Sequence, residues 1–451
     1  MQYELFAVVS ISFFLICFLQ QILDIRRNKT VQISNIFGFM FSITYGILPA
    51  IYVLSYFLHG KTYVRIRYST ERLNDLWIWL LLAIVGYFVF RVSYKLKWRN
   101  EKQPIEDIQQ EKKYDIDDFM RLQITCIVCL AIGLVSLYLW GRAYGGVLGR
   151  IKVANLIRSG ILKINNPFDI LKHSSRLLFF VSYSSLLLLK RRYRKILNIC
   201  ILAISGVFSV LFLFACDGRM GMATYFVILL LIATDIFGGK TKIGKKLIVF
   251  TIVGIVALLI VMEMDGITYY IRHGETLVDN GSTKDGLLSE FGYILMSGQN
   301  AVHLWETEGT PFLIFQDLFS GLFSWLPHAL KPADFVIIWD FNTALCESAE
   351  TLNAQIPTDY VSTTLYDLGI LGVFIFGFVF GRIIRAVDIA RKKNKNLFYE
   401  VFYYSFALII LRYVNYCMFY DFILYMFYLF VAMIIWKATK VLMNSKRKGY
   451  K

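Results

Sequence analysis

Apolar runs alternate along the chain with short polar or basic segments, a pattern typical of a polytopic membrane protein. Most runs approach the ~20 residues that an α-helix needs to cross a bilayer. The pattern predicts an all-α bundle of about eleven transmembrane spans within one integral membrane domain, residues 1–451. The expected spans are 4–23, 34–58, 76–95, 122–143, 175–189, 196–216, 220–237, 246–264, 357–381, 397–416 and 420–437.

Clusters of Lys and Arg between the runs predict the orientation. The segment Lys190–Lys195 separates two spans and carries five basic residues, so it is expected on the cytoplasmic side. Alternation from there places the other strongly basic clusters on the same side: Arg26 and Arg27, 95–121, 240–246, 391–395 and 446–451. We therefore predict an outside N-terminus and a cytoplasmic C-terminus.

One connection is much longer than the others, at residues 265–355, and the alternation places it on the non-cytoplasmic side. It contains the apolar stretch Pro311–Leu330, which is interrupted by Asp317. We expect this stretch to form an interfacial or re-entrant helix and not a further span, because a twelfth span would move the basic cluster 391–395 outside.

Composition agrees with this organisation. The chain is 57% hydrophobic and 18% charged, and its net charge of +16 comes largely from basic clusters between apolar runs. This distribution indicates contact with a lipid bilayer and not with nucleic acid. Cys126 and Cys129 lie inside an apolar run, where we expect them to pack as small apolar residues.

Several basic residues are predicted on the outer side, against the usual charge bias. Arg65 and Arg67 lie in the outer segment 59–75, and residues 142–172 interleave basic with apolar residues as a surface helix would. Outward-facing Arg residues can bind an anionic headgroup such as a lipid pyrophosphate, or simply contact anionic lipids.

Two further Arg residues have unusual positions. Arg219 belongs to the segment Asp217–Gly221, a tight outer junction between two spans, and is either a phosphate ligand or a snorkelling side chain. Arg412 lies inside the apolar run 397–419, where a charge usually faces a cavity or a partner. An ion pair with Asp367 or Asp421 is the structural alternative for Arg412.

Acid and base candidates gather in the large outer loop, but the sequence does not choose among them. They are Asp265, Arg272, His273, Glu290, Asp317, His328, Asp340, Glu347, Glu350 and, just after the loop, Asp359. H-E-x-x-H, G-x-S-x-G and P-loop patterns are absent, which argues against common proteases, hydrolases and ATP-driven pumps. We expect neither a metal nor a cofactor.

Three motifs resemble those of the O-antigen polymerases (Wzy), which polymerise oligosaccharide repeat units. Asp217-Gly218-Arg219-Met220-Gly221 resembles the family's turn with a small residue, Arg and Gly. Trp325-Leu326-Pro327-His328-Ala329-Leu330-Lys331-Pro332 resembles the Pro-bearing segment late in the family's large loop. Ile356-Pro357 followed by Leu365-Tyr366-Asp367-Leu368-Gly369-Ile370-Leu371-Gly372 resembles its entry into the next span, although the family often has Glu before this Gly pattern.

The resemblance implies a GT-C-like, metal-independent glycosyltransferase of the bacterial cytoplasmic membrane that makes O-antigen, capsule or a related polysaccharide. Its substrates would be glycans linked to undecaprenyl pyrophosphate, and a repeat-unit flippase and a chain-length regulator would be its partners. Arg65, Arg67, Arg219, Arg272 and Arg412 would bind pyrophosphate, and the base would be among His328, Glu347, Glu350 and Asp359.

Three alternatives stay open at this point. An O-antigen ligase would transfer finished glycan to another acceptor, and His328 is compatible with it. A flippase or transporter should carry polar residues in both halves of its spans, whereas we expect them mainly at the outer side. A membrane acyltransferase would need a His deep in a span, and all five His residues fall in predicted outer segments.

Overall fold

The computed structural model of this chain is helical throughout its described parts. These parts are 85% helix and contain no strand. They comprise residues 2–28, 30–59, 73–97, 114–158, 162, 164, 166–216, 218–234, 248, 252, 270, 291–323, 335–345, 356–394 and 396–448.

Seven helical segments among the described residues have the length and apolarity to cross a membrane. They come from α1 (Gln2–Asn28), α2 with α3 (Ile33–Ser42 and Leu48–His59), α4 (Leu73–Lys95), α5 (Ile116–Arg142), α10 (Lys195–Cys216), α18 (Tyr360–Lys393) and α20 (Phe419–Lys448). All seven coincide with predicted spans. Helices of this length and apolarity are those of a membrane protein. Helices α2 and α3 are joined by a π-helical turn, η1 (Ile43–Ile47).

Three other predicted spans correspond to shorter helices: α9 (Leu177–Lys190), α11 (Gly218–Thr234) and α19 (Leu397–Tyr413). The 14 residues of α9 rise only about 21 Å, less than the ~30 Å hydrocarbon core. The predicted span 246–264 lies outside the described residues except for 248 and 252. Helices α18 and α20 both continue about ten residues beyond their predicted ends. The added residues are rich in Lys and Arg, which favour helix, so the helices continue past the apolar runs.

Glycines allow α4 and α18 to pack closely. A Cβ atom at Gly377 would lie 2.9 Å from the carbonyl oxygen of Gly86, and one at Gly381 would lie 2.7 Å from that of Phe90. Small residues spaced by four bring two helix backbones together in this way inside membranes. The sequence Gly377-x-x-x-Gly381 therefore fixes one side of the bundle.

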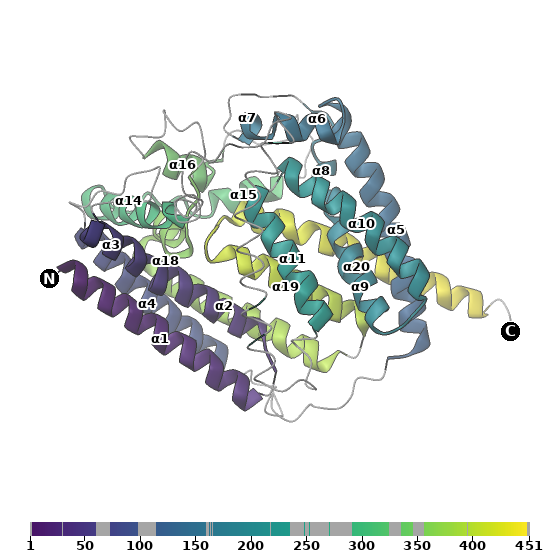
Figure 1. The fold of residues 1–451 in the computed structure, drawn as a ribbon, viewed down its shortest axis with the longest axis horizontal. Coiled ribbons are helices and arrows are strands. Elements are labelled where there is room, and N and C mark those ends of the chain that lie inside the picture. The colour runs from purple at the N-terminus through teal and green to yellow at the C-terminus, as the bar shows by residue number, and fades with distance from the viewer. Residues whose placement is uncertain are drawn as a thin grey trace.

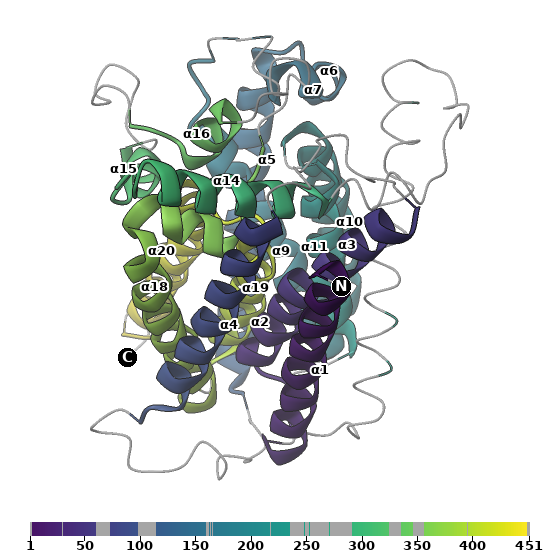
Figure 2. The ribbon, with the colours of Figure 1, turned by 90° about the vertical axis from the view of Figure 1, so that its left-hand side faces the viewer.

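Helix α19 lies in the middle of the molecule. It contacts α2, α5, α9, α11, α18 and α20, and most of its side chains are buried (Figure 2). The helices α5, α9 and α10 pack on one side of it, and α1 to α4 with α18 pack on the other (Figure 1). The free thiols Cys126 and Cys129 of α5 are buried, as predicted.

The two ends of the bundle differ. One end, here called the loop end, carries the short helices α6 (Val147–Lys152), α7 (Ala154–Arg158), α8 (Leu171–Ser175), α15 (Gln316–Phe323) and α16 (Ile338–Ala344), with α14 (Tyr293–Thr307) lying across α4 and α18 (Figure 2). The other end, here called the basic end, carries the last turns of α1, α4 and α18. Within the predicted surface helix at 142–172, the described helical residues beyond the end of α5 belong to short helices, α6, α7 and the start of α8. Helix α15, within Pro311–Leu330, has eight residues and is too short to be a span.

A buried polar network occupies the half of the bundle near the basic end. Asp388 accepts hydrogen bonds from Tyr94 (2.9 Å), Tyr403 (2.6 Å) and the backbone N–H of Ile33 (3.2 Å), and Arg91 pairs with Asp24. We expected polar side chains mainly at the outer side, and this network shows that the half of the bundle near the basic end also buries polar side chains. Asp24, Arg91 and Asp388 lie near helix ends in the sequence, and in the structure they form hydrogen bonds and an ion pair between helices.

Candidate functional site

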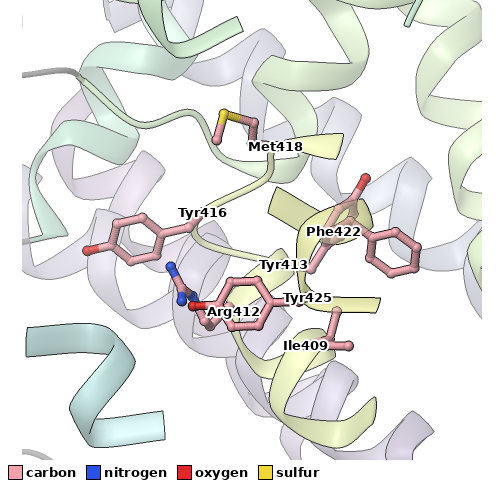
Figure 3. A pocket seen from close by; sticks show the side chains of 7 residues that line it. All are labelled: Ile409, Arg412, Tyr413, Tyr416, Met418, Phe422 and Tyr425. Carbon is pink, nitrogen blue, oxygen red and sulfur yellow. The ribbon is translucent and has the colours of Figure 1, made fainter. Parts of the chain in front are cut away.

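Arg412 lies in the last turn of α19 at the loop end. Its guanidinium carbon is 4.6 Å from the ring centroid of Tyr425 in α20, and Figure 3 shows the two side chains next to each other. A cation over an aromatic face is attracted by the ring quadrupole. The C-terminus of α19 also favours a positive charge. The ring of Tyr425 and the helix dipole therefore both stabilise the charge of Arg412.

Arg176 contacts the same aromatic ring from another helix. Its guanidinium carbon is 4.0 Å from the centroid of Tyr425, and the residue is 2% exposed. Arg176 is the N-cap of α9, an end where the helix dipole disfavours a cation. The helix dipole therefore disfavours a cation at this position, and the ring of Tyr425 is one of the groups that offset this cost.

Lys172 of α8 completes a cationic cluster, which we define as Lys172, Arg176 and Arg412. Lys172 interacts electrostatically with Arg176, with Tyr420 in the first turn of α20, and with Asp169. Three cations from three different segments therefore surround the first turns of α20 at the loop end.

The cluster favours an anion on electrostatic grounds. The guanidinium groups of Arg176 and Arg412 share one ring, so they are less than about 9 Å apart and repel each other by ~2 kcal/mol at an effective dielectric constant of ~20. An anion placed between them would replace this repulsion with two attractions. Guanidinium forks match the oxygens of phosphate particularly well.

A small hollow adjoins the cluster between α19 and α20 (Figure 3). Its free space is about 10 Å³, room for about one water molecule. A sugar or a pyrophosphate would need α20 or its neighbours to move. The lining residues are Ile409, Arg412, Tyr413, Tyr416, Met418, Phe422 and Tyr425.

Helix α18 is broken close to this hollow. Gly369 has φ 63° and ψ −150°, a conformation open essentially only to glycine. The break leaves backbone carbonyls of the preceding turn for other donors: the N–H of Leu313 bonds to the oxygen of Tyr366 (3.1 Å), and that of Ile314 to the oxygen of Asp367 (3.3 Å). The segment before α15 is thereby attached to α18.

Asp317 of α15 connects the segment that is attached to α18 with the start of α20. Its Oδ2 accepts the backbone N–H of Phe419 (2.7 Å) at the start of α20, and the residue is 0% exposed. Burial raises the pKa of Asp317 from its ordinary 3.8 to about 7, although the backbone N–H groups of Phe419, Leu318 and Tyr420 lower it. A carboxyl group that titrates near neutrality is common at functional sites.

Asp359, predicted as a candidate base, is fully buried as the N-cap of α18. One oxygen accepts from Tyr45 (2.7 Å), Trp79 (3.2 Å) and the backbone N–H groups of Val361 (2.9 Å) and Ser362 (3.2 Å). The other oxygen accepts from the hydroxyl of Ser362. These contacts position the start of α18, and the catalytic role of Asp359 stays a prediction.

The other predicted site residues fall largely outside the described parts of the chain. Arg219 is the second residue of α11, which begins at Gly218, so four of the five residues of the predicted junction Asp217–Gly221 form the first turn of that helix. The side chain of Arg219 is not among the described ones. His328, Glu347, Glu350, Arg65, Arg67 and Arg272 lie outside the described residues altogether.

Sequence reasoning singled out Arg412 but missed Arg176. Arg176 stands at the start of a predicted span, where a basic residue attracts no notice, and only the fold brings it to Tyr425. Arg150, expected on the outer surface, is buried instead, 5.2 Å from the ring of Tyr144 and 5.9 Å from that of Trp140.

Comparisons with known proteins add no assignment. No family model, no curated protein and no solved structure matches the chain.

Proposed function

We propose that this protein is a membrane glycosyltransferase that polymerises oligosaccharide repeat units carried on undecaprenyl pyrophosphate. The product would be O-antigen, capsule or a related surface polysaccharide. The reaction would take place at the loop end, which the basic-cluster rule assigns to the outer face of the bacterial cytoplasmic membrane.

The cationic cluster carries the proposal. Lys172, Arg176 and Arg412 gather at the loop end of the bundle, and two of them are held against one aromatic ring. A lipid-linked pyrophosphate would lie at this level if the loop end is the outer boundary of the membrane. A site of this kind supports catalysis if charge develops on the departing phosphate in the transition state. The motif resemblance around Arg219 and Gly369 points to the same chemistry.

The proposed reaction is a single displacement. A hydroxyl group of the incoming lipid-linked repeat unit attacks the anomeric carbon of the growing glycan, and its proton passes to a base of the protein. The bond from that carbon to the pyrophosphate oxygen breaks, and undecaprenyl pyrophosphate leaves with the electron pair. The cationic cluster stabilises the charge on the leaving group, and His328, Glu347 and Glu350 remain the candidate bases.

Complementation tests the proposal. A source strain lacking the chain would be supplied with the wild type or with Arg176→Ala, and surface polysaccharide would be compared at equal protein level. We expect polymer to fall roughly tenfold to a hundredfold in Arg176→Ala, the effect of losing one or two charge-assisted bonds. Arg142→Ala is the matched control, because Arg142 is an exposed Arg at the loop end of α5. Normal polymer in Arg176→Ala would contradict the assignment.

A flippase or transporter is the second candidate, and two observations favour it. Helix α18 is discontinuous at Gly369, as in many transporters, and polar residues line the interior near the basic end. A flippase defect would trap single repeat units on the cytoplasmic side, whereas a polymerase defect would leave them outside. An O-antigen ligase, the third candidate, would leave long lipid-linked polymer intact but unattached.

A further inference from the structure

Two buried carboxyl groups lie where α15, the break of α18 and the start of α20 meet. Asp317 and Asp367 are each 0% exposed, and they interact electrostatically with each other. Asp367 Oδ1 accepts the backbone N–H of Phe315 (3.1 Å), and Asp317 Oδ2 accepts that of Phe419. The remaining oxygens, Asp317 Oδ1 and Asp367 Oδ2, are fully buried and accept no hydrogen bond from a described residue.

Apolar rings enclose the pair. Phe315, Phe376 and Phe419 pack on one another, with ring centroids 5.4, 5.8 and 4.9 Å apart. In such surroundings two adjacent carboxylates cannot both stay ionised, because each disfavours the charge of the other and neither is hydrated. No described cationic side chain interacts with Asp367.

Hydrogen-bond donors decide where one negative charge fits best. Asp317 receives backbone N–H groups from Phe419 and Tyr420 at the positive N-terminal end of α20, whereas Asp367 receives one from Phe315. The arrangement stabilises the anion on Asp317 and leaves a proton on Asp367.

The segment that these groups hold is strained. Phe312, Ile314 and Phe315 all have positive φ angles, of 48°, 41° and 59°, which non-glycine residues rarely adopt. Its described attachment includes three N–H bonds to Tyr366 and Asp367, the contact of Asp317 with α20, and the packing of Phe315 on Phe376 and Phe419. The bonds made by the two carboxyl groups are the part of this attachment that depends on protonation.

We propose that Asp317 and Asp367 form a proton-binding site that latches residues 311–323 into the break of α18, and that loss of this proton releases the segment. Release would free the start of α20, where Phe422, Tyr425 and the preceding Met418 line the hollow next to Arg412. The latch would thus control access to the cationic cluster, and it holds whichever reaction takes place there.

The direction of the pH effect follows from the carboxyl groups. Asp317, whose pKa is about 7, is the first of the pair to ionise, and the pair keeps its second proton in the latched state. A proton that the latched state binds more tightly stabilises that state, so latching weakens as the pH rises above about 7 and the second proton is lost. The other described titratable groups that interact with Asp317 are Tyr413 of α19 and Cys417 of the α19–α20 turn. Burial raises the pKa of the Cys417 thiol well above its ordinary value, and a phenol ordinarily titrates near 10, so neither loses its proton in this range.

Hydrogen–deuterium exchange of the full-length protein in lipid nanodiscs tests the latch. Amides of residues 312–318 would be followed at about pH 5.5 and about pH 8.5, with labelling times corrected for intrinsic exchange. We expect their protection in the wild type to fall about tenfold or more at the higher pH. Asp317→Asn and Asp367→Asn should each remove this dependence, whereas Asp340→Asn, which removes an exposed carboxyl group of α16, should keep it.

Three results would overturn the proposal. The first is equal protection of the wild type at both pH values, a measurement that needs no variant to fold. The second is an unchanged pH dependence in an Asp317→Asn protein that keeps wild-type exchange in α4 and α19. The third is recovery of protection at the higher pH on adding sodium ions but not choline, which would make the pair a metal-cation site.

Discussion

At the scale of single residues, the buried aspartates that position helices differ from the cations that gather at the loop end. Asp388 and Asp359 each accept hydrogen bonds from side chains of other helices, and these bonds take the place of bonds to water. Arg176 and Arg412 instead share one aromatic ring. This difference makes the cationic cluster, and not the buried aspartates with many donors, the candidate for binding.

Asp359→Ala should destabilise the protein. The substitution removes the N-cap of α18 and leaves the buried Tyr45 hydroxyl and Trp79 N–H without their acceptor. We expect a loss of roughly 2–4 kcal/mol, the sum of a lost cap and buried donors left unsatisfied, seen as a lower Tm in detergent.

Asp359→Asn is the comparison that separates capping from catalysis. The amide oxygen can still accept the N–H groups of Val361 and Ser362, so most of the stability should return. An Asp359→Asn protein with wild-type Tm but no polymer would assign Asp359 to the reaction instead.

The sequence revealed some of these residues and hid others for a physical reason. A charge inside a long apolar run, such as Arg412, is conspicuous because it has no aqueous neighbour in sequence. Arg176 lies at the edge of an apolar run, where charges are ordinary, and Asp317 was one of many acid and base candidates in the large loop. Their burial depends on contacts with α20, more than 100 residues away, which no local pattern encodes.

At the scale of elements, long apolar helices followed directly from the hydrophobic pattern, whereas irregular elements did not. A break at Gly369 leaves no mark on hydropathy, since glycine is frequent in membrane helices that are continuous. The short helices at the loop end were also hidden, because their ends are fixed by packing on α5, α10 and α20 and not by a change in polarity.

Gly369→Ala should disrupt the break. Its φ of 63° would cost a side chain ~1–3 kcal/mol in backbone strain, and the new Cβ would collide with the hydroxyl of Thr310. We expect a lower Tm and faster proteolysis of the 311–323 segment.

Gly206→Ala in α10 is the matched control. A Cβ atom there meets nothing within 4 Å, so alanine should leave stability unchanged or raise it by about 0.5–1 kcal/mol. Equal stability of the two variants would mean that α18 tolerates a continuous helix at Gly369.

At the scale of the whole molecule, the account depends on which end of the bundle faces out. The cationic cluster, α14, α15 and α16 share the loop end, and the basic residues in the last turns of α1 and α18 lie at the other end. Alkaline phosphatase fused after Gly146 should therefore be active, and the same enzyme fused after Arg192 should be inactive. The reverse pattern would place the cluster in the cytoplasm and exclude the proposed reaction.

The central claim is that this protein joins lipid-linked repeat units. The most direct measurement is mass spectrometry of undecaprenyl-linked glycans from a source strain lacking the chain, with the wild-type chain restored as the control. We predict that single repeat units accumulate on the outer face of the cytoplasmic membrane in the deletion strain and that longer glycans return on complementation. Lipid-linked glycans of normal length in the deletion strain would contradict the account.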